Sequence, residues 1–166
     1  PDNSSTDAFG HGRAFLGSPV LVDLDKDGLL EIVIGSYDGN VYAWKPIDKD
    51  GDGSADPQHG FPVFCKSEAG AVPADKVCVG DQSQFAPQII TTPAVGILDP
   101  ESANPDIAKY PTILIGTSEV CQDSLSISKS TRFYAIFHNG NANASGSPFV
   151  PGFPVKLFGP LSDVLP

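Results

Sequence analysis

The stretch that most constrains the fold of this chain is residues 23–31, which reads Asp-Leu-Asp-Lys-Asp-Gly-Leu-Leu-Glu. Its alternating carboxylates would repel one another in a tight loop unless a cation lay between them. Calcium binds oxygen ligands of this kind in proteins, and the glycine lets the chain turn sharply. We therefore predict a calcium loop in which the ligands are the side chains of Asp23, Asp25, Asp27 and Glu31 and the backbone carbonyl of Leu29.

A second stretch with the same pattern, residues 48–56, follows closely and reads Asp-Lys-Asp-Gly-Asp-Gly-Ser-Ala-Asp. One such stretch is readily explained as a charged turn, because Asp and Gly favour turns even without a metal. Two of them so close together favour calcium. The predicted ligands of this second loop are Asp48, Asp50, Asp52, Ser54 and Asp56.

The loops differ from the helix-flanked EF-hand. An EF-hand has a bidentate glutamate at about the twelfth position of its loop, where this chain has Ile34 and His59. The first loop is followed by Ile-Val-Ile-Gly, a β-branched run typical of a strand. We therefore expect the ligand set to close at the ninth position and the loop to join two strands.

Composition narrows the class of protein. The chain has 166 residues with 10 basic and 20 acidic side chains, so nucleic acid and anionic membrane surfaces are not expected partners. No apolar run is long enough for a membrane span. We see no signal peptide, and the opening Pro-Asp-Asn indicates a processed or excised end. With 17 Gly, 16 Pro and short β-branched apolar runs, the chain is expected to be all-β.

The three cysteines fit no zinc motif. Cys65 and Cys78 bracket a polar segment, and a disulfide between them would add roughly 3 kcal/mol of stability by chain entropy; buried free thiols are the alternative. Cys121 would pair outside this chain, exchange into the first pair, or remain free. Calcium loops and a disulfide together suit an oxidising, calcium-rich location, so we expect an extracellular, secreted or cell-surface protein, with the periplasm as a further option.

Four short strands occur twice in the same order. Ser18-Pro19 matches Thr92-Pro93, and Gly-Phe-Pro-Val recurs 92 residues later, at 60–63 and 152–155. Between these markers lie matching strands, expected at 20–22, 31–36 and 41–44 and again at 94–97, 111–117 and 132–137. Four strands per repeat are typical of a propeller blade.

The predicted organisation has four parts. Residues 1–8 are an arm, 9–91 a first blade with an insertion, 92–158 a second, degenerate blade, and 159–166 the start of a third unit. The insertion at 118–131 is expected to be an exposed hairpin extension or an excursion towards a partner. The position of the calcium loop in the second blade, 98–106, is interrupted by prolines, and we expect only a surface loop there.

Phe9-Gly10, Gly17-Ser18-Pro19 and the loop at 23–31 together resemble the FG-GAP repeat of integrin alpha-subunit β-propellers and the bacterial secreted and surface repeats of that type. The resemblance implies a blade whose first two strands are joined by a calcium loop, with the five ligands already named. Glu31 replaces the more usual aspartate of the family. The loop at 48–56 lies outside the family's standard position, so its ligands follow from the residue pattern alone.

A propeller of this family closes with several more blades than this chain supplies, and two open blades would leave unpaired strand edges. The expected fold is therefore a partial β-propeller of about two four-stranded antiparallel blades. Its expected partners are another protein chain or the remainder of a larger propeller, with a cell-surface glycan as an option.

The expected function is an extracellular calcium-binding module in which Ca²⁺ is structural and which mediates cell adhesion, protein–protein interaction or assembly. The alternative is a secreted propeller that binds or cleaves polysaccharide. No nucleophile–base pair is recognisable, so we do not expect an enzyme. The repeated aromatic positions favour core packing over a sugar-stacking platform; they are Tyr42, Trp44, Phe61, Phe133, Tyr134 and Phe153.

Overall fold

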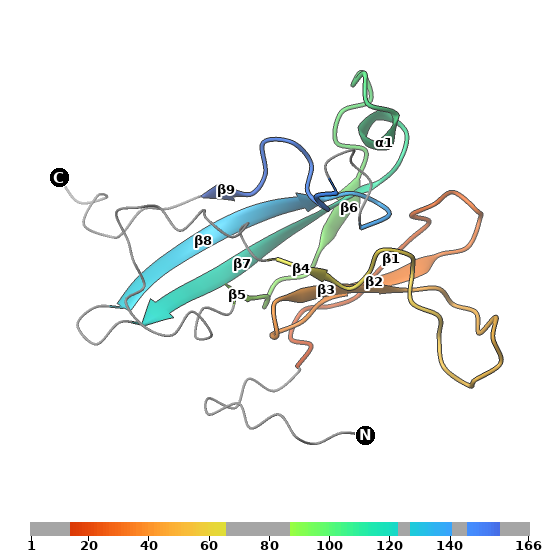
Figure 1. Ribbon diagram of the computed structural model, residues 1–166, viewed down its shortest axis with the longest axis horizontal. Helices are drawn as coiled ribbons and strands as arrows, with labels where there is room; N and C mark the ends of the chain where they lie inside the picture. The colour runs from red at the N-terminus through yellow and green to blue at the C-terminus, as the bar shows by residue number, and fades with distance from the viewer. Residues whose placement is uncertain (1–13, 66–86, 123–126, 141–145, 157–166) are drawn as a thin grey trace.

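A computed structural model describes residues 14–65, 87–122, 127–140 and 146–156 of the chain, and these form two antiparallel sheets with very little helix (Figure 1). The all-β fold class is therefore confirmed. The first sheet is a meander of four strands in sequence order. Its strands are β1 (Val20–Val22), β2 (Glu31–Gly35), β3 (Asn40–Trp44) and β4 (Val63–Phe64).

The second sheet contains the same meander with one strand added. Strands β6, β7, β8 and β9 pair in sequence order, while β5 pairs with the distal part of β7. A four-residue helix, α1 (Pro105–Ala108), lies between β6 and β7 and is capped by Asn104. The strands are β5 (Pro87–Gln88), β6 (Ala94–Gly96), β7 (Thr112–Gln122), β8 (Ile127–Ile136) and β9 (Val155–Lys156).

The internal repeat is present in the strand register. Ile32 lies opposite Trp44 in the first sheet, and their sequence counterparts Ile113 and Ile136 lie opposite each other in the second. The outer strands agree as well, since Val41 pairs with Val63 as Phe133 pairs with Val155. The two sheets are therefore two copies of one four-stranded unit, as the sequence predicted.

The insertion at 118–131 is a hairpin extension, one of the two alternatives expected for it. Strands β7 and β8 remain paired through it as far as Gln122 opposite Ile127. Strand β5, in contrast, lies in the insertion of the first unit and was not expected to join the second sheet. The N-terminal arm, Cys78 and the start of the third unit lie outside the described residues.

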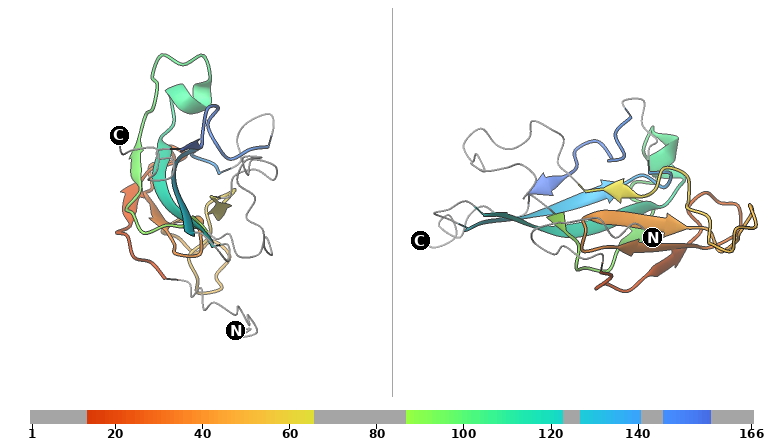
Figure 2. Two further views of the ribbon diagram at one scale, coloured as in Figure 1. Left: turned by 90° about the vertical axis from the view of Figure 1, so that its left-hand side faces the viewer. Right: turned by 60° about the horizontal axis from the view of Figure 1, so that its bottom comes forward.

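The core forms where the two sheets lie face to face (Figure 2). Gly35 of β2 sits directly under Ile89, and a Cβ there would collide with the Ile89 side chain. Only glycine allows this close approach of the first sheet to the second. The core contains Ile89 and residues from both sheets, which are Val33, Val41, Ala43, Val63, Ile113, Ile115, Tyr134 and Ile136.

Within the described part of the chain, no helix is long and apolar enough to cross a membrane. A closed propeller requires more sheets than the two described here. What is established is a pair of stacked antiparallel sheets built from a repeated unit, and the propeller remains a proposal.

Candidate metal centre

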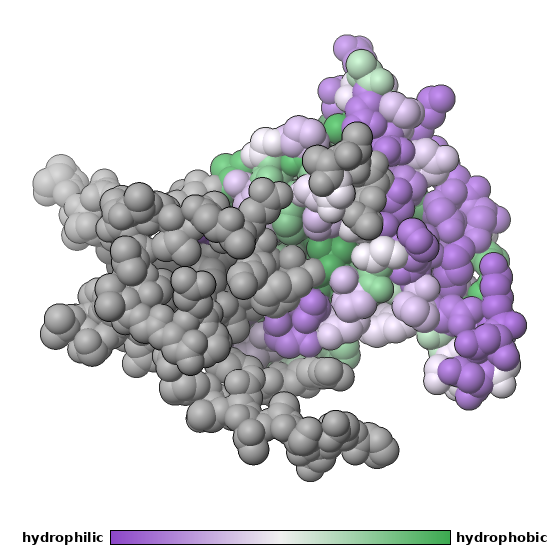
Figure 3. Space-filling view, viewed as in Figure 1, coloured by the Kyte–Doolittle hydropathy of each residue, from purple (hydrophilic) through white to green (hydrophobic). Residues whose placement is uncertain are grey.

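Both predicted calcium loops project from one end of the first sheet (Figure 1). The first loop joins β1 to β2, and the second lies between β3 and β4. In an antiparallel meander these two connections leave the sheet at the same end. Figure 3 shows hydrophilic residues gathered at this end of the molecule. The fold therefore brings two acidic loops near each other although β2 and β3 separate them in sequence.

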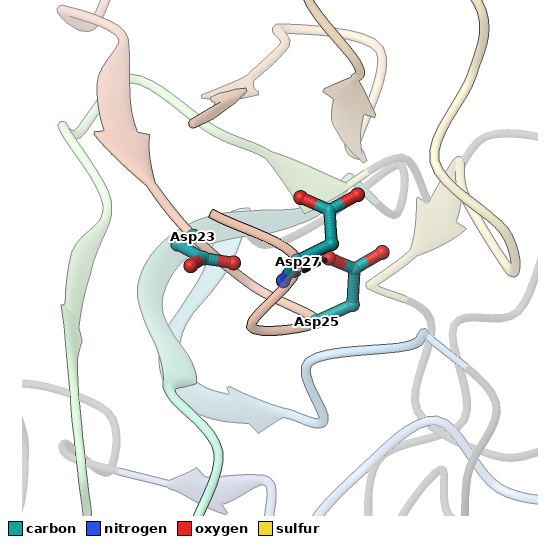
Figure 4. A group of neighbouring side chains, drawn as sticks. All are labelled: Asp23, Asp25 and Asp27. Carbon is teal, nitrogen blue, oxygen red and sulfur yellow. Dashed lines mark hydrogen bonds between the residues drawn. The ribbon is translucent and has the colours of Figure 1, made fainter. Parts of the chain in front are cut away.

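Three aspartates of the first loop converge. Asp23, Asp25 and Asp27 each offer a carboxylate oxygen, and these oxygens lie within 4.8 Å of one another (Figure 4). Backbone N–H groups hold the carboxylates in place: Gly28 donates to Asp23 at 3.0 Å, and Leu29 donates to Asp27 at 2.9 Å. The loop is thus folded with its acidic side chains on one side, as the alternation predicted.

Glu31, the first residue of β2, is fully buried beneath this loop. Its Oε2 accepts a hydrogen bond of 2.7 Å from the Leu24 backbone N–H. Its Oε1 has no hydrogen-bond partner among the described residues, and neither does the buried Oδ1 of Asp23. Burial raises the pKa of the Glu31 carboxyl, and the nearby Asp25 and Asp27 charges add to the effect. A buried carboxylate with a spare oxygen is suited to a cation.

Lys45 places its ammonium among these carboxylates. Its Nζ lies 2.7 Å from Asp25 Oδ2, 2.7 Å from Asp27 Oδ2 and 3.7 Å from Glu31 Oε1. The hydrogen bonds to both aspartates raise the pKa of Lys45, and its hydrogen bond is the main cause of the lowered pKa of Asp27. Burial opposes the same change at Asp25, but bonds from Lys45 and Gln58 still lower its pKa.

The second loop has a similar acidic group, with Asp48, Asp50 and Asp56 offering oxygens within 4.8 Å of one another. Asp52 lies outside this group, and its Oδ1 accepts a 2.7 Å hydrogen bond from the Ser54 N–H. Bonds from the Gly53 and Gly51 N–H groups lower the pKa of Asp48. The loop is solvent-exposed except at Asp56, which is partly buried.

The two loops share one hydrogen-bond pattern. The first aspartate of each accepts from the glycine N–H five residues later, at 3.0 Å from Gly28 and 2.8 Å from Gly53. The last carboxylate of each accepts from the N–H of the loop's second residue, Leu24 or Lys49. Such agreement indicates that the shared nine-residue pattern specifies one loop conformation.

The backbone angles support the same conclusion. Positions four and six of both loops have positive φ, 62° at Lys26 and 88° at Gly28, against 76° at Gly51 and 87° at Gly53. Lysine rarely adopts this conformation and glycine adopts it freely. The first loop therefore keeps a strained residue where the second has glycine.

The other predicted residues are a backbone ligand, a pair of cysteines and a set of aromatic positions. Leu29 lies in the first loop, and its proposed ligation through the carbonyl stays a prediction. Cys65 is buried, whereas its proposed partner Cys78 lies outside the described residues. Of the six aromatic positions, Phe61 and Tyr134 are buried in the core, as expected. The other four are only partly buried: Tyr42, Trp44, Phe133 and Phe153.

Sequence reasoning missed Lys45 and Gln58 as parts of the centre. They flank the second loop, and both donate to Asp25 Oδ2 of the first, at 2.7 Å and 3.2 Å. The position of Lys45 directly after the third strand gave a signal, because the end of that strand adjoins the first loop in a meander. Nothing in the pattern distinguished this lysine from an exposed one.

Comparison of the chain with family models, with curated proteins and with solved structures gives no match. The FG-GAP resemblance accordingly depends on the chain's own residues.

Proposed function

We propose that this chain is a calcium-binding module of the FG-GAP type, with structural Ca²⁺ in both acidic loops, that works outside the cell in adhesion, protein–protein interaction or assembly. One observation carries the proposal. Three carboxylates converge in the first loop over Glu31, a fully buried carboxylate that keeps an oxygen without a hydrogen-bond partner among the described residues.

The residues present fit a hard divalent cation. Asp23, Asp25, Asp27 and Glu31 offer only oxygen donors, the ligand type that calcium takes. Lys45 supplies a single positive charge to this group of four carboxylates. A divalent ion would neutralise more of the repulsion, and Lys45 would have to leave the two aspartates to make room for it.

Calcium in such a loop acts on stability rather than on chemistry. An ion that binds only the folded loop stabilises the fold by about 2.7 kcal/mol when present at about a hundredfold excess over its dissociation constant. For a chain of this size that free energy corresponds to roughly 5–10 °C in the unfolding midpoint. The module is thus proposed to be robust where calcium is abundant and weaker where it is scarce.

A non-enzymatic role is part of the proposal. His138 is buried, stacks on Tyr110 at 4.1 Å between ring centroids and has its pKa lowered by burial, although the nearby Asp106 acts in the opposite direction. His59 is exposed three residues after the second loop. These environments do not favour either histidine as part of a nucleophile–base pair.

The test is thermal unfolding in calcium, in magnesium and in EGTA, for the wild type and for Asp27→Asn. The proposal predicts a midpoint that is higher in calcium than in EGTA, with a smaller calcium effect in the variant. Equal midpoints in calcium and EGTA would overturn it.

A further inference from the structure

Each four-stranded unit has two apolar faces, because alternate strand residues point to opposite sides of a sheet. We define the front face of a unit by the side chains level with Ile32 or its counterpart Ile113, and the back face by those level with Val33 or its counterpart Leu114. The front faces comprise Leu21, Ile32, Ile34, Tyr42 and Trp44 in the first unit, and Val95, Ile113, Ile115, Tyr134 and Ile136 in the second.

Within the chain, the front face of the second unit packs on the back face of the first. The core joins Ile113, Ile115 and Tyr134 to Val33 and Val41. Equivalent residues of the two units also lie next to each other. The Ser18 N–H donates a 3.0 Å hydrogen bond to Oγ1 of Thr92, its sequence counterpart. The units are therefore related head to tail. Such an arrangement uses a different face of each unit and leaves one face of each without this cover.

Two matched pairs show that each of the other faces keeps exposed apolar side chains, although Ile34 on the front face of the first unit and Ala135 on the back face of the second are buried within the chain. On the front faces, Ile32 is 36% exposed whereas Ile113 is 0% exposed. On the back faces the order reverses, since Val63 is 4% exposed and its counterpart Val155 is 42% exposed. The sequence keeps apolar residues at these positions in both units, although only one of each pair is buried.

The first unit also has a counterpart of Ile89, the residue that packs over Gly35 where the two units meet. Ile89, which covers Gly35, corresponds to Phe15, which is exposed and packs edge-on against Tyr42 and Trp44 at 5.9 and 6.3 Å between ring centroids.

The counterpart of Gly35 in the second unit is Gly116. Among the described residues, a Cβ on Gly116 would meet nothing closer than 3.8 Å, so this part of the chain does not fill the space that Ile89 fills over Gly35. Phe15 on the front face and the open position over Gly116 on the back face form the same kind of pair as Ile89 and Gly35.

We propose that copies of this chain associate head to tail, with the front face of the first unit of one copy docking on the back face of the second unit of the next. The partner is a second copy because the required contact already exists once inside the chain, and the new one continues it with matched residues. A contact between two different faces is heterologous, so it extends to further copies or closes into a ring. The inference rests on the proposed function only in taking the module to act by association.

The test is sedimentation of the full chain over a range of concentrations, with one face blocked at a time. Leu21→Glu places a charge on the exposed front face, and Val155→Glu places one on the exposed back face. Gly116→Val is a second back-face variant that fills the open position. Ala103→Glu adds the same charge to the exposed loop before α1 and serves as the matched control. Near-ultraviolet circular dichroism checks that each variant is folded.

The wild type and Ala103→Glu are expected to grow beyond the 17.4 kDa monomer as concentration rises. Each face variant alone is expected to stay monomeric. An equimolar mixture of Leu21→Glu with Val155→Glu, or with Gly116→Val, keeps one intact pair of faces and should give dimers and nothing larger.

A wild type that stays monomeric at all concentrations overturns the proposal, as do folded face variants that assemble like the control, or mixtures that give no dimer. Sedimentation is run in calcium and in EGTA beside the unfolding midpoints. If the chain associates but its unfolding midpoint is the same in calcium and in EGTA, only the calcium proposal is overturned. If the midpoint depends on calcium but the chain stays monomeric, only this inference is overturned.

Discussion

The two acidic loops share a sequence pattern, a backbone conformation and a hydrogen-bond network, yet their surroundings differ. In the first, Glu31 is fully buried and Lys45 lies among the carboxylates. In the second, the acidic side chains are exposed apart from the partly buried Asp56. The nine-residue pattern therefore determines the shape of the loop, whereas the neighbouring strands determine what its charges contribute to stability.

The largest difference in stability between the two loops is expected when the last carboxylate of each is removed. Glu31→Ala leaves the buried Leu24 N–H without its acceptor and is expected to lower the free energy of unfolding by about 2–3 kcal/mol. Asp56→Ala removes the acceptor of the Lys49 N–H in an exposed loop and should cost less than about 1 kcal/mol. Urea unfolding measures both, and Glu31→Gln, which can still accept from Leu24, is the control. Equal losses of unfolding free energy in the two loops would show that burial of the last carboxylate makes no difference.

Lys45 should make the first loop the weaker calcium site. Lys45→Met removes the ammonium that lies 2.7 Å from Asp25 and Asp27 and must leave before an ion binds. Calcium affinity at the first loop should then rise roughly tenfold, equivalent to about 1.4 kcal/mol. Lys49→Met, in the exposed second loop, is the matched control and should leave the first loop's affinity unchanged. Calorimetric titration with calcium measures these affinities. An unchanged affinity in Lys45→Met would show that the lysine does not weaken calcium binding.

Without calcium, buried Glu31 should affect how the free energy of unfolding depends on pH. Its pKa is raised in the folded state, so the stability linked to its protonation is fully present below its unfolded pKa of about 4.3 and is lost as pH rises through the folded value. Asp27 and Asp48 have lowered pKa values, so their contributions are present above about pH 3.9 and are lost only at lower pH. Urea unfolding in EGTA should therefore show a decline from about pH 4.5 upwards that Glu31→Gln lacks. The same decline in that variant would contradict the assignment.

The smallest effect concerns the strained backbone. Lys26 has φ 62° where the second loop has Gly51 at φ 76°. Lys26→Gly should therefore stabilise the protein by about 0.5–1 kcal/mol, and Gly51→Lys should destabilise it by a similar amount. Thermal unfolding of both variants tests this exchange. A destabilised Lys26→Gly would show that the lysine side chain, which lies 5.8 Å from the Tyr110 ring, matters more than the strain.

Much of the fold was predictable because short sequence patterns recur in both units. The β-branched runs of β2 and β7 and the recurring Gly-Phe-Pro-Val predicted the strands of both units. The added strand β5 was not predictable, since Pro87 and Gln88 carry no strand signal and pair only because β7 extends past them.

The candidate site divides in the same way. Asp23, Asp25 and Asp27 converge because their spacing and the following glycine act within one loop. The positions of Lys45 and Gln58 depend on which strand ends meet, and Glu31 is fully buried although most of its loop is exposed. These are tertiary effects that no local pattern contains.

The most direct measurement is isothermal titration of the calcium-free chain with calcium, for the wild type, Asp27→Asn, Asp50→Asn and the double variant. We expect two bound ions in the wild type, one in each single variant and none in the double variant. An absence of binding to the wild type, or a double variant that still binds two ions, would contradict the claim that the two acidic loops are calcium sites.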